Sequence, residues 1–136
     1  MIHLVKLAVG IEDVGHLRRI QSQRLKDHGM VFHRTRMIPR RAEELCAGGS
    51  IYWVVKGSIV ARQKVLAVHE DKEDDGRPFC LLELDAELVE TMPQPKRPFQ
   101  GWRYLKPEDA PADMAGGDIA EMPPEMLREL KELGLL

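Results

Sequence analysis

The chain has 136 residues, of which 43% are hydrophobic and 31% are charged, and its formal net charge is -2. This length suits one domain with a single core, so we expect residues 1–136 to fold as one unit. No apolar run approaches the about 18 residues that span a bilayer, and the N-terminus lacks the basic region and cleavage site of a signal peptide. The sequence therefore predicts a cytoplasmic protein without a membrane anchor.

The first half of the chain predicts alternating strands and helices. Residues 2–9 are rich in aliphatic side chains and predict a strand. Apolar residues at helical spacing then predict a helix over 11–28, which Gly29 ends. Residues 30–38 have no helical period and predict a short strand or an ordered loop. Residues 39–47 predict a short helix that stops at Gly48 and Gly49.

The clearest local signal is a pair of β-rich runs on either side of Gly57 and Ser58. Glycine at the first position of a two-residue loop predicts a type II′ hairpin. In that register Trp53 lies opposite Arg62, and the face that carries Tyr52 is the better candidate for the core. Further strands are predicted at residues 78–85 and 99–105, with a Pro-rich loop at 92–98 between them.

The last third of the chain is rich in Pro, Gly, Ala and acids. We expect a main body at 1–106, an irregular acidic connection at 107–122 and a C-terminal helix at 123–134. Together these elements predict an α+β fold: a mixed, mostly antiparallel sheet of five or six strands with two or three helices.

Charge is distributed unevenly along the chain. Residues 18–64 hold eleven Lys or Arg and three acids, whereas residues 65–136 hold eight Lys or Arg and seventeen acids. Clustered Lys and Arg attract phosphate-bearing ligands, so the basic segment predicts an anionic partner. The alternative is that the two segments neutralise each other across the fold.

All four Trp and Tyr residues lie in predicted strands that basic residues flank. Single-stranded nucleic acid is bound by rings that stack on bases and cations that contact phosphates. The alternative is that the rings simply fill the core and the basic residues line its rim. The candidate ligand-binding residues are Arg34, Arg36, Arg40, Trp53, Arg62, Lys64, Trp102, Arg103 and Tyr104.

His33 is the candidate catalytic residue, as a group that could transfer a proton. It lies in a single His-x-Thr pattern, and Arg34 and Arg36 beside it could clamp a phosphate. A purely structural histidine is the alternative. The chain contains no P-loop, GxSxG, GxGxxG or HExxH motif.

No metal site or cofactor is expected. Cys46 and Cys80 form no CxxC or Cys/His pattern, which disfavours a disulfide framework, a zinc site and a redox dithiol. The acidic turn at residues 71–76 imitates the start of a calcium loop, but Leu82 stands where the bidentate carboxylate is needed.

Four stretches, FHRTRMIPRRAEEL, GGSIYWVVKG, FQGWRYLKPEDAP and LRELKELGLL, resemble the domain-of-unknown-function family 1489, which occurs mainly in alphaproteobacteria. The resemblance spans almost the whole chain and implies a bacterial cytoplasmic protein, but it transfers no catalytic residue. AEELCAGGSIYWVVKG followed by IVARQKVLAV is similar to the helix and hairpin of PUA-like domains, including the ASCH and EVE types. That similarity implies a curved sheet or pseudobarrel and, by analogy, binding of RNA or modified bases.

The favoured function is therefore binding of RNA or a nucleotide-like ligand at a basic and aromatic surface. One alternative is a small enzyme that acts on a phosphorylated or nucleic-acid substrate with His33, Arg34 and Arg36. Another is a protein-interaction module that uses the acidic C-terminal third, and the oligomeric state stays open. Convergence of the candidate residues on one concave surface would favour binding or catalysis, whereas dispersal would favour structural roles.

Overall fold

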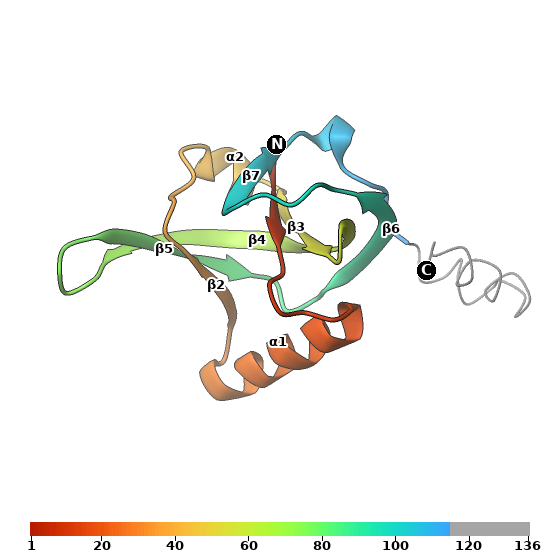
Figure 1. Cartoon of the computed structure of the whole chain (residues 1–136). Helices are drawn as coiled ribbons and strands as arrows, with labels where there is room; N and C mark the ends of the chain where they lie inside the picture. Colours follow the sequence, from red (N-terminus) through yellow and green to blue (C-terminus); the bar gives the residue numbers. More distant parts are fainter. Residues whose placement is uncertain (115–136) are drawn as a thin grey trace, which may run out of the picture.

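The computed structural model describes residues 1–114 of the chain (Figure 1). It contains α-helices α1 (Val14–His28) and α2 (Ala42–Cys46) and the 3-10 helix η1 (Pro107–Asp109). The predicted helix at 123–134 and the preceding residues 115–122 lie outside the described residues. The strands, in chain order, are β1 (His3–Leu7), β2 (Val31–Thr35), β3 (Ser50–Val55), β4 (Ser58–Lys72), β5 (Pro78–Leu84), β6 (Val89–Pro95) and β7 (Trp102–Leu105).

The seven strands form one mixed sheet in the order β2-β5-β4-β3-β1-β7, with β6 paired to β4 beside this path. Only β1 and β3 are parallel among the pairs of described strands. β5 and β6 follow one another along β4, because β5 pairs with its second half and β6 with its first half. The far part of the β4–β5 hairpin extends away from the body as an arm (Figure 1). An α+β fold with a mostly antiparallel sheet is thus confirmed.

Both faces of the sheet are covered, and β3 is buried along its whole length. The larger cluster of buried side chains includes Leu17 of α1 together with Trp53 and Leu82 of the sheet. A smaller cluster on the opposite face includes Tyr52 and Ile59. Each such aliphatic side chain contributes about 1.5–3 kcal/mol when it is fully buried. The predicted core face around Tyr52 is therefore only one of two.

The turn between β3 and β4 differs from the prediction. Lys56 and Gly57 have φ angles of 50° and 84°. Positive φ at both central positions is the requirement of a type I′ turn, so the type II′ turn at Gly57 and Ser58 was wrong.

The register of this hairpin also differs from the prediction. Tyr52 lies opposite Arg62 and Trp53 lies opposite Ala61, and the register shifts between Trp53 and Val54. The predicted opposition of Trp53 and Arg62 is therefore wrong. The loop residues are Lys56 and Gly57 rather than Gly57 and Ser58, and this change alone would place Trp53 opposite Val60. The one-residue bulge then shifts Trp53 to Ala61, and alternation in the sequence reveals neither effect.

β6 occupies much of the segment that was predicted to be a Pro-rich loop. Proline cannot donate to a neighbouring strand, but it is tolerated at the border of a sheet. Among the described residues, β6 pairs with one strand, β4. Its Thr91 also forms an isolated β-bridge with Asp113. β6 brings the sheet to seven strands, so the predicted number of five or six was too low.

α1 begins later than predicted but ends where predicted. The Asp13 side chain accepts a hydrogen bond of 2.7 Å from the backbone N–H of His16, so residues 11–13 precede the helix. Gly29 ends it with a φ of 74°, a conformation that glycine adopts without strain. In Figure 1, α1 lies along one side of the strands. It thereby brings its inward-facing residues against the face that carries Trp53.

Candidate ligand-binding site

Ion pairs connect the basic segment, residues 18–64, to the acidic residues that follow it. Arg34 and Arg36 both bind the carboxylate of Glu73 at the β4–β5 turn. Arg62 binds Asp113 through two hydrogen bonds of 2.6 Å. Asp113 balances the charge of Arg62, whereas the single carboxylate of Glu73 is shared by Arg34 and Arg36 and balances only one of them.

Both indoles lie in the core, so neither ring is available to stack on a base. Trp53 and Trp102 are each 4% exposed. Their Nε1 groups donate to Gln63 Oε1 at 2.9 Å and to the Met37 carbonyl at 2.8 Å. Tyr104 is the exception among the three aromatic candidates, since it is 37% exposed.

The candidate ligand-binding residues do not meet on one concave surface. Arg34 and Arg36 lie beside the arm, and Arg62 and Lys64 line a cleft with Asp113. Arg40 lies near Tyr104, because the backbone N–H of the next residue, Arg41, donates to the Tyr104 hydroxyl at 3.1 Å. Arg103 precedes Tyr104 on β7 and so points to the opposite face.

His33 points to the opposite face of the sheet from Arg34. Along β2 the side chains of Val31 and Thr35 are buried, as alternation requires for the face that His33 shares. The guanidinium of Arg34 lies 3.9 Å from the ring centroid of Phe79 on the outer face. The predicted clamp of Arg34 and Arg36 is therefore not assembled around His33.

Lys6 lies on the same inner face as His33. On β1 it is opposite Trp53 in the parallel pair and opposite Trp102 in the antiparallel pair. Residues that are opposed in neighbouring strands project to the same face of a sheet, so the three side chains form a row. His33 packs edge-on against Trp53, with ring centroids 5.2 Å apart. Lys6 and His33 therefore share one indole as a neighbour.

Arg24 brings a second cation from α1. Its Nη1 donates to the carbonyl of Phe32, the residue before His33, at 3.4 Å. Within residues 1–114 neither Lys6 nor Arg24 lies within ion-pair distance of a carboxylate. We name Lys6, Arg24 and His33 the His33 cluster.

His33 is half-buried, and its imidazole is incompletely hydrogen-bonded. Its Nε2 atom has no partner among the described residues. Burial, together with the charges of Lys6 and Arg24, lowers the pKa of His33 to about 4, so the ring is neutral at pH 7. Burial also lowers the pKa of Lys6. A buried polar group without a partner costs about 1–3 kcal/mol. The cluster is thus held at a cost in stability.

A buried amide network holds the indole beneath the cluster. Gln63 is fully buried, and its side chain forms two hydrogen bonds with the side-chain amide of Gln21 on α1. It also accepts from Trp53 and donates to the carbonyl of Asp85 at 3.1 Å. A fully satisfied buried network of this kind fixes side-chain orientation. Arg24 follows Gln21 by three residues and so lies on the same side of α1.

Sequence reasoning found His33 but missed Lys6 and Arg24. A usable signal was present for Lys6, because it continues the alternation of Ile2 and Leu4 in the first predicted strand. A lysine at an inward position of a buried strand is uncommon, so the position stands out in the sequence. Arg24 is spaced by seven residues from the core residue Leu17, which likewise places it toward the sheet.

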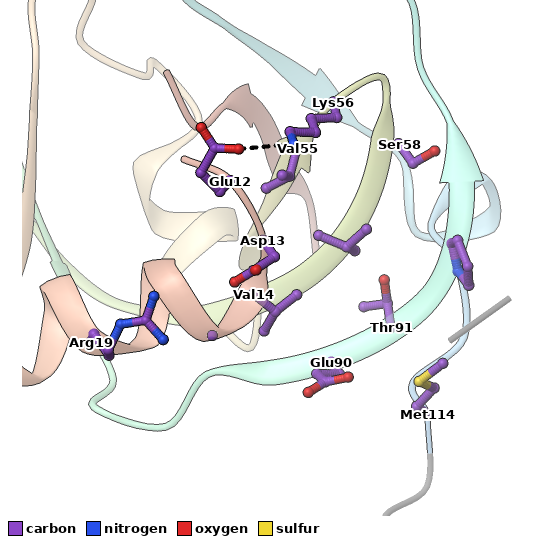
Figure 2. A pocket seen from close by; sticks show the side chains of 13 residues that line it. Glu12, Asp13, Val14, Arg19, Val55, Lys56, Ser58, Glu90, Thr91 and Met114 are labelled. Carbon is purple, nitrogen blue, oxygen red and sulfur yellow. Dashed lines mark ion pairs between the residues drawn. The ribbon is translucent and has the colours of Figure 1, made fainter. Parts of the chain in front are cut away.

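A separate cavity of about 940 Å³ lies between the start of α1, the β3–β4 turn and β6 (Figure 2). Val14 and Met114 contribute apolar walls, and Glu12 forms a 2.9 Å ion pair with Lys56 at one side. Thr91 in its wall donates to a main-chain carbonyl. This cavity has room for a ligand, but none of its lining side chains has a buried polar atom without a partner.

Metal and thiol chemistry find no support in the part of the chain that the structure describes. No three His, Cys, Asp or Glu side chains are grouped there to hold a metal ion. Cys46 and Cys80 are free cysteines, and burial raises the pKa of Cys80 to about 11. Neither helix of residues 1–114 has the length and hydropathy needed to cross a membrane.

Fold and site define a small α+β protein with a cationic, half-buried cluster at the junction of α1, β1 and β2. The chain belongs to the DUF1489 family, described as a protein of unknown function, whose family model matches residues 4–136. The family resemblance drawn from the sequence is thus confirmed. Comparison with curated proteins and with solved structures gives no match, so the PUA-like similarity is not confirmed.

Proposed function

We propose that this protein binds a nucleotide-like anion, free or as part of an RNA strand, at the His33 cluster. The observation that carries the proposal is the buried, unpartnered Nε2 of His33 beside two cations that have no carboxylate partner in residues 1–114. An anion would balance the charges of Lys6 and Arg24 and would accept a hydrogen bond from the imidazole.

We expect an anion to enter the cluster through movement of its side chains. The two cationic side chains are long, and Arg24 is anchored near His33 by one hydrogen bond of 3.4 Å, at the weak end of the range. Lys6 is only partly buried. Side-chain rearrangement on binding is common even where the backbone stays fixed, so these side chains can move aside to admit an anion.

A ring beside the cluster suits a nucleotide better than a simple anion. Phe32 is half-buried and packs edge-on with the exposed His28, with ring centroids 5.5 Å apart. Phe32 precedes His33 and so points to the opposite face of β2, but β2 is an edge strand, and a nucleotide held at His33 would meet the ring by extending around this edge. Base stacking on such a ring contributes about 1–3 kcal/mol.

The proposal favours binding over turnover. The enzymatic alternative needed Arg34 and Arg36 to hold the substrate at His33, and both arginines bind Glu73 instead. We also propose a PUA-like, curved sheet and a cytoplasmic location. The succession of β5 and β6 along β4 supports such curvature.

Calorimetric titration with adenosine 5′-monophosphate and with a short 5′-phosphorylated oligoribonucleotide tests the proposal. We expect Lys6→Met to weaken binding at least about tenfold, because loss of a charged hydrogen bond costs about 1.5–3 kcal/mol. Lys106→Met is the matched control, since Lys106 is exposed and lies outside the cluster. Absence of binding at low salt, or an equal loss in both variants, would contradict the proposal.

A further inference from the structure

Resting on this proposed function, we infer that the His33 cluster takes a phosphate monoester, the terminal phosphate of a nucleotide or strand, in preference to an internal phosphodiester. The inference follows from the charge of the cluster, from the number of its donors and from its depth.

Charge favours the monoester. The cluster holds two cations, Lys6 and Arg24, and no carboxylate from residues 1–114 pairs with either. A phosphate monoester carries about -1.5 to -2 charges at pH 7, whereas each phosphodiester carries one. Only the monoester matches both cations, and a diester would leave one of the two charges unbalanced.

The donor set matches a terminal phosphate as well. An ammonium, a guanidinium and an imidazole N–H come from three different elements, β1, α1 and β2. A monoester offers three terminal oxygens, one for each donor group, whereas a diester offers two. Hydrogen bonds of this charge-assisted kind are about twice as strong as neutral ones.

Depth is the third argument. The Nε2 atom of His33 is closed off from solvent, and the indole against the ring is 4% exposed. A terminal phosphate that approaches this buried atom has only one chain of atoms behind it. An internal phosphodiester has a nucleotide on each side, so two chain segments must pass the same surface. The packing of α1 on this face of the sheet leaves less room for two segments than for one. Recognition of an end is therefore the expected mode.

Competing ligands of equal size test this inference. Adenosine 5′-monophosphate and adenosine 3′,5′-cyclic monophosphate share base and sugar but differ as monoester and diester. We expect the monoester to bind at least about tenfold more tightly, and an oligoribonucleotide with a 5′-phosphate to bind more tightly than the same strand with a 5′-hydroxyl. The preference should shrink in Lys6→Met and Arg24→Gln, and should persist in Arg97→Gln, which alters an exposed arginine outside the cluster.

The outcomes separate the two claims. Equal affinity for monoester and diester, both lost in Lys6→Met, would overturn the inference and leave the proposed function standing. Absence of binding for every nucleotide and strand at low salt would overturn the proposed function itself.

Discussion

The imidazole of His33 meets the indole of Trp53 edge-on, with ring centroids 5.2 Å apart and an angle of 86° between the ring planes. Such aromatic pairs contribute about 0.5–1.5 kcal/mol beyond the area they bury. The indole is in turn held by Gln63 through a 2.9 Å hydrogen bond. His33 therefore rests on a rigid support while its Nε2 atom lacks a partner in residues 1–114.

Replacement of His33 by Phe should separate binding from stability. Phenylalanine keeps the packing against Trp53 and removes a buried polar atom that has no partner. We expect the free energy of unfolding to rise by about 1 kcal/mol at pH 7, while nucleotide binding is lost. Urea unfolding and calorimetric titration measure the two effects. A marked loss of stability would mean that the imidazole is a structural hydrogen-bonding group.

The pKa of His33 gives stability a defined pH dependence. The pKa is about 4 in the folded chain and near its ordinary value of 6.5 in the unfolded chain, so the unfolded chain binds more protons between these values. The neutral imidazole makes its full contribution to the free energy of unfolding above pH 6.5. This contribution falls by up to about 3 kcal/mol as the pH decreases toward 4.

Carboxylates with lowered pKa values, such as Glu73 and Asp113, also reduce stability in acid. They are present in both wild type and His33→Phe, so the difference between the two proteins isolates the histidine. Urea unfolding between pH 4.5 and 7, near the two pKa values, should give a shallower decline for the variant. If wild type and His33→Phe lose the same free energy of unfolding over this pH range, the lowered pKa of His33 would be contradicted.

The amide network predicts a large effect of Gln63→Leu. The leucine leaves the Trp53 N–H and the Gln21 amide buried without their partner, which costs about 1–3 kcal/mol for each group. The midpoint of urea unfolding should fall accordingly, whereas the exposed control Gln100→Leu should change it little. Combined replacement of Gln21 and Gln63 by Leu should recover part of the loss.

The β3–β4 turn can be tested by two substitutions of Lys56. In a type I′ turn this position has positive φ, which asparagine accepts and valine resists. Since both variants remove the same charge, their difference reports the backbone alone. We expect Lys56→Asn to be more stable than Lys56→Val by about 1 kcal/mol in urea unfolding. Equal stability would place Lys56 in an extended conformation, as the predicted type II′ turn requires.

Local features of the fold could be predicted from sequence because they depend on neighbouring residues. Gly29 ends α1 as expected, and the hairpin near Gly57 exists. The bulge after Trp53 could not be predicted, since one inserted residue leaves no mark on composition or spacing. β6 was missed because the prolines that normally break strands are tolerated where a strand borders the sheet.

The site was less accessible to sequence reasoning because it depends on distant segments. Parallel pairing of β1 with β3 places Lys6 beside Trp53, and α1 then adds Arg24. The predicted partners of His33 were its sequence neighbours, Arg34 and Arg36. In a strand the adjacent residue points to the opposite face, so proximity in sequence was misleading there.

Titration of the His33 imidazole by NMR, with and without saturating adenosine 5′-monophosphate, tests the central claim most directly. An anion in contact with the ring stabilises its protonated form, so we predict that ligand raises the pKa of His33 from about 4 by at least about one unit. An unaltered pKa of His33 at saturating ligand would contradict the account.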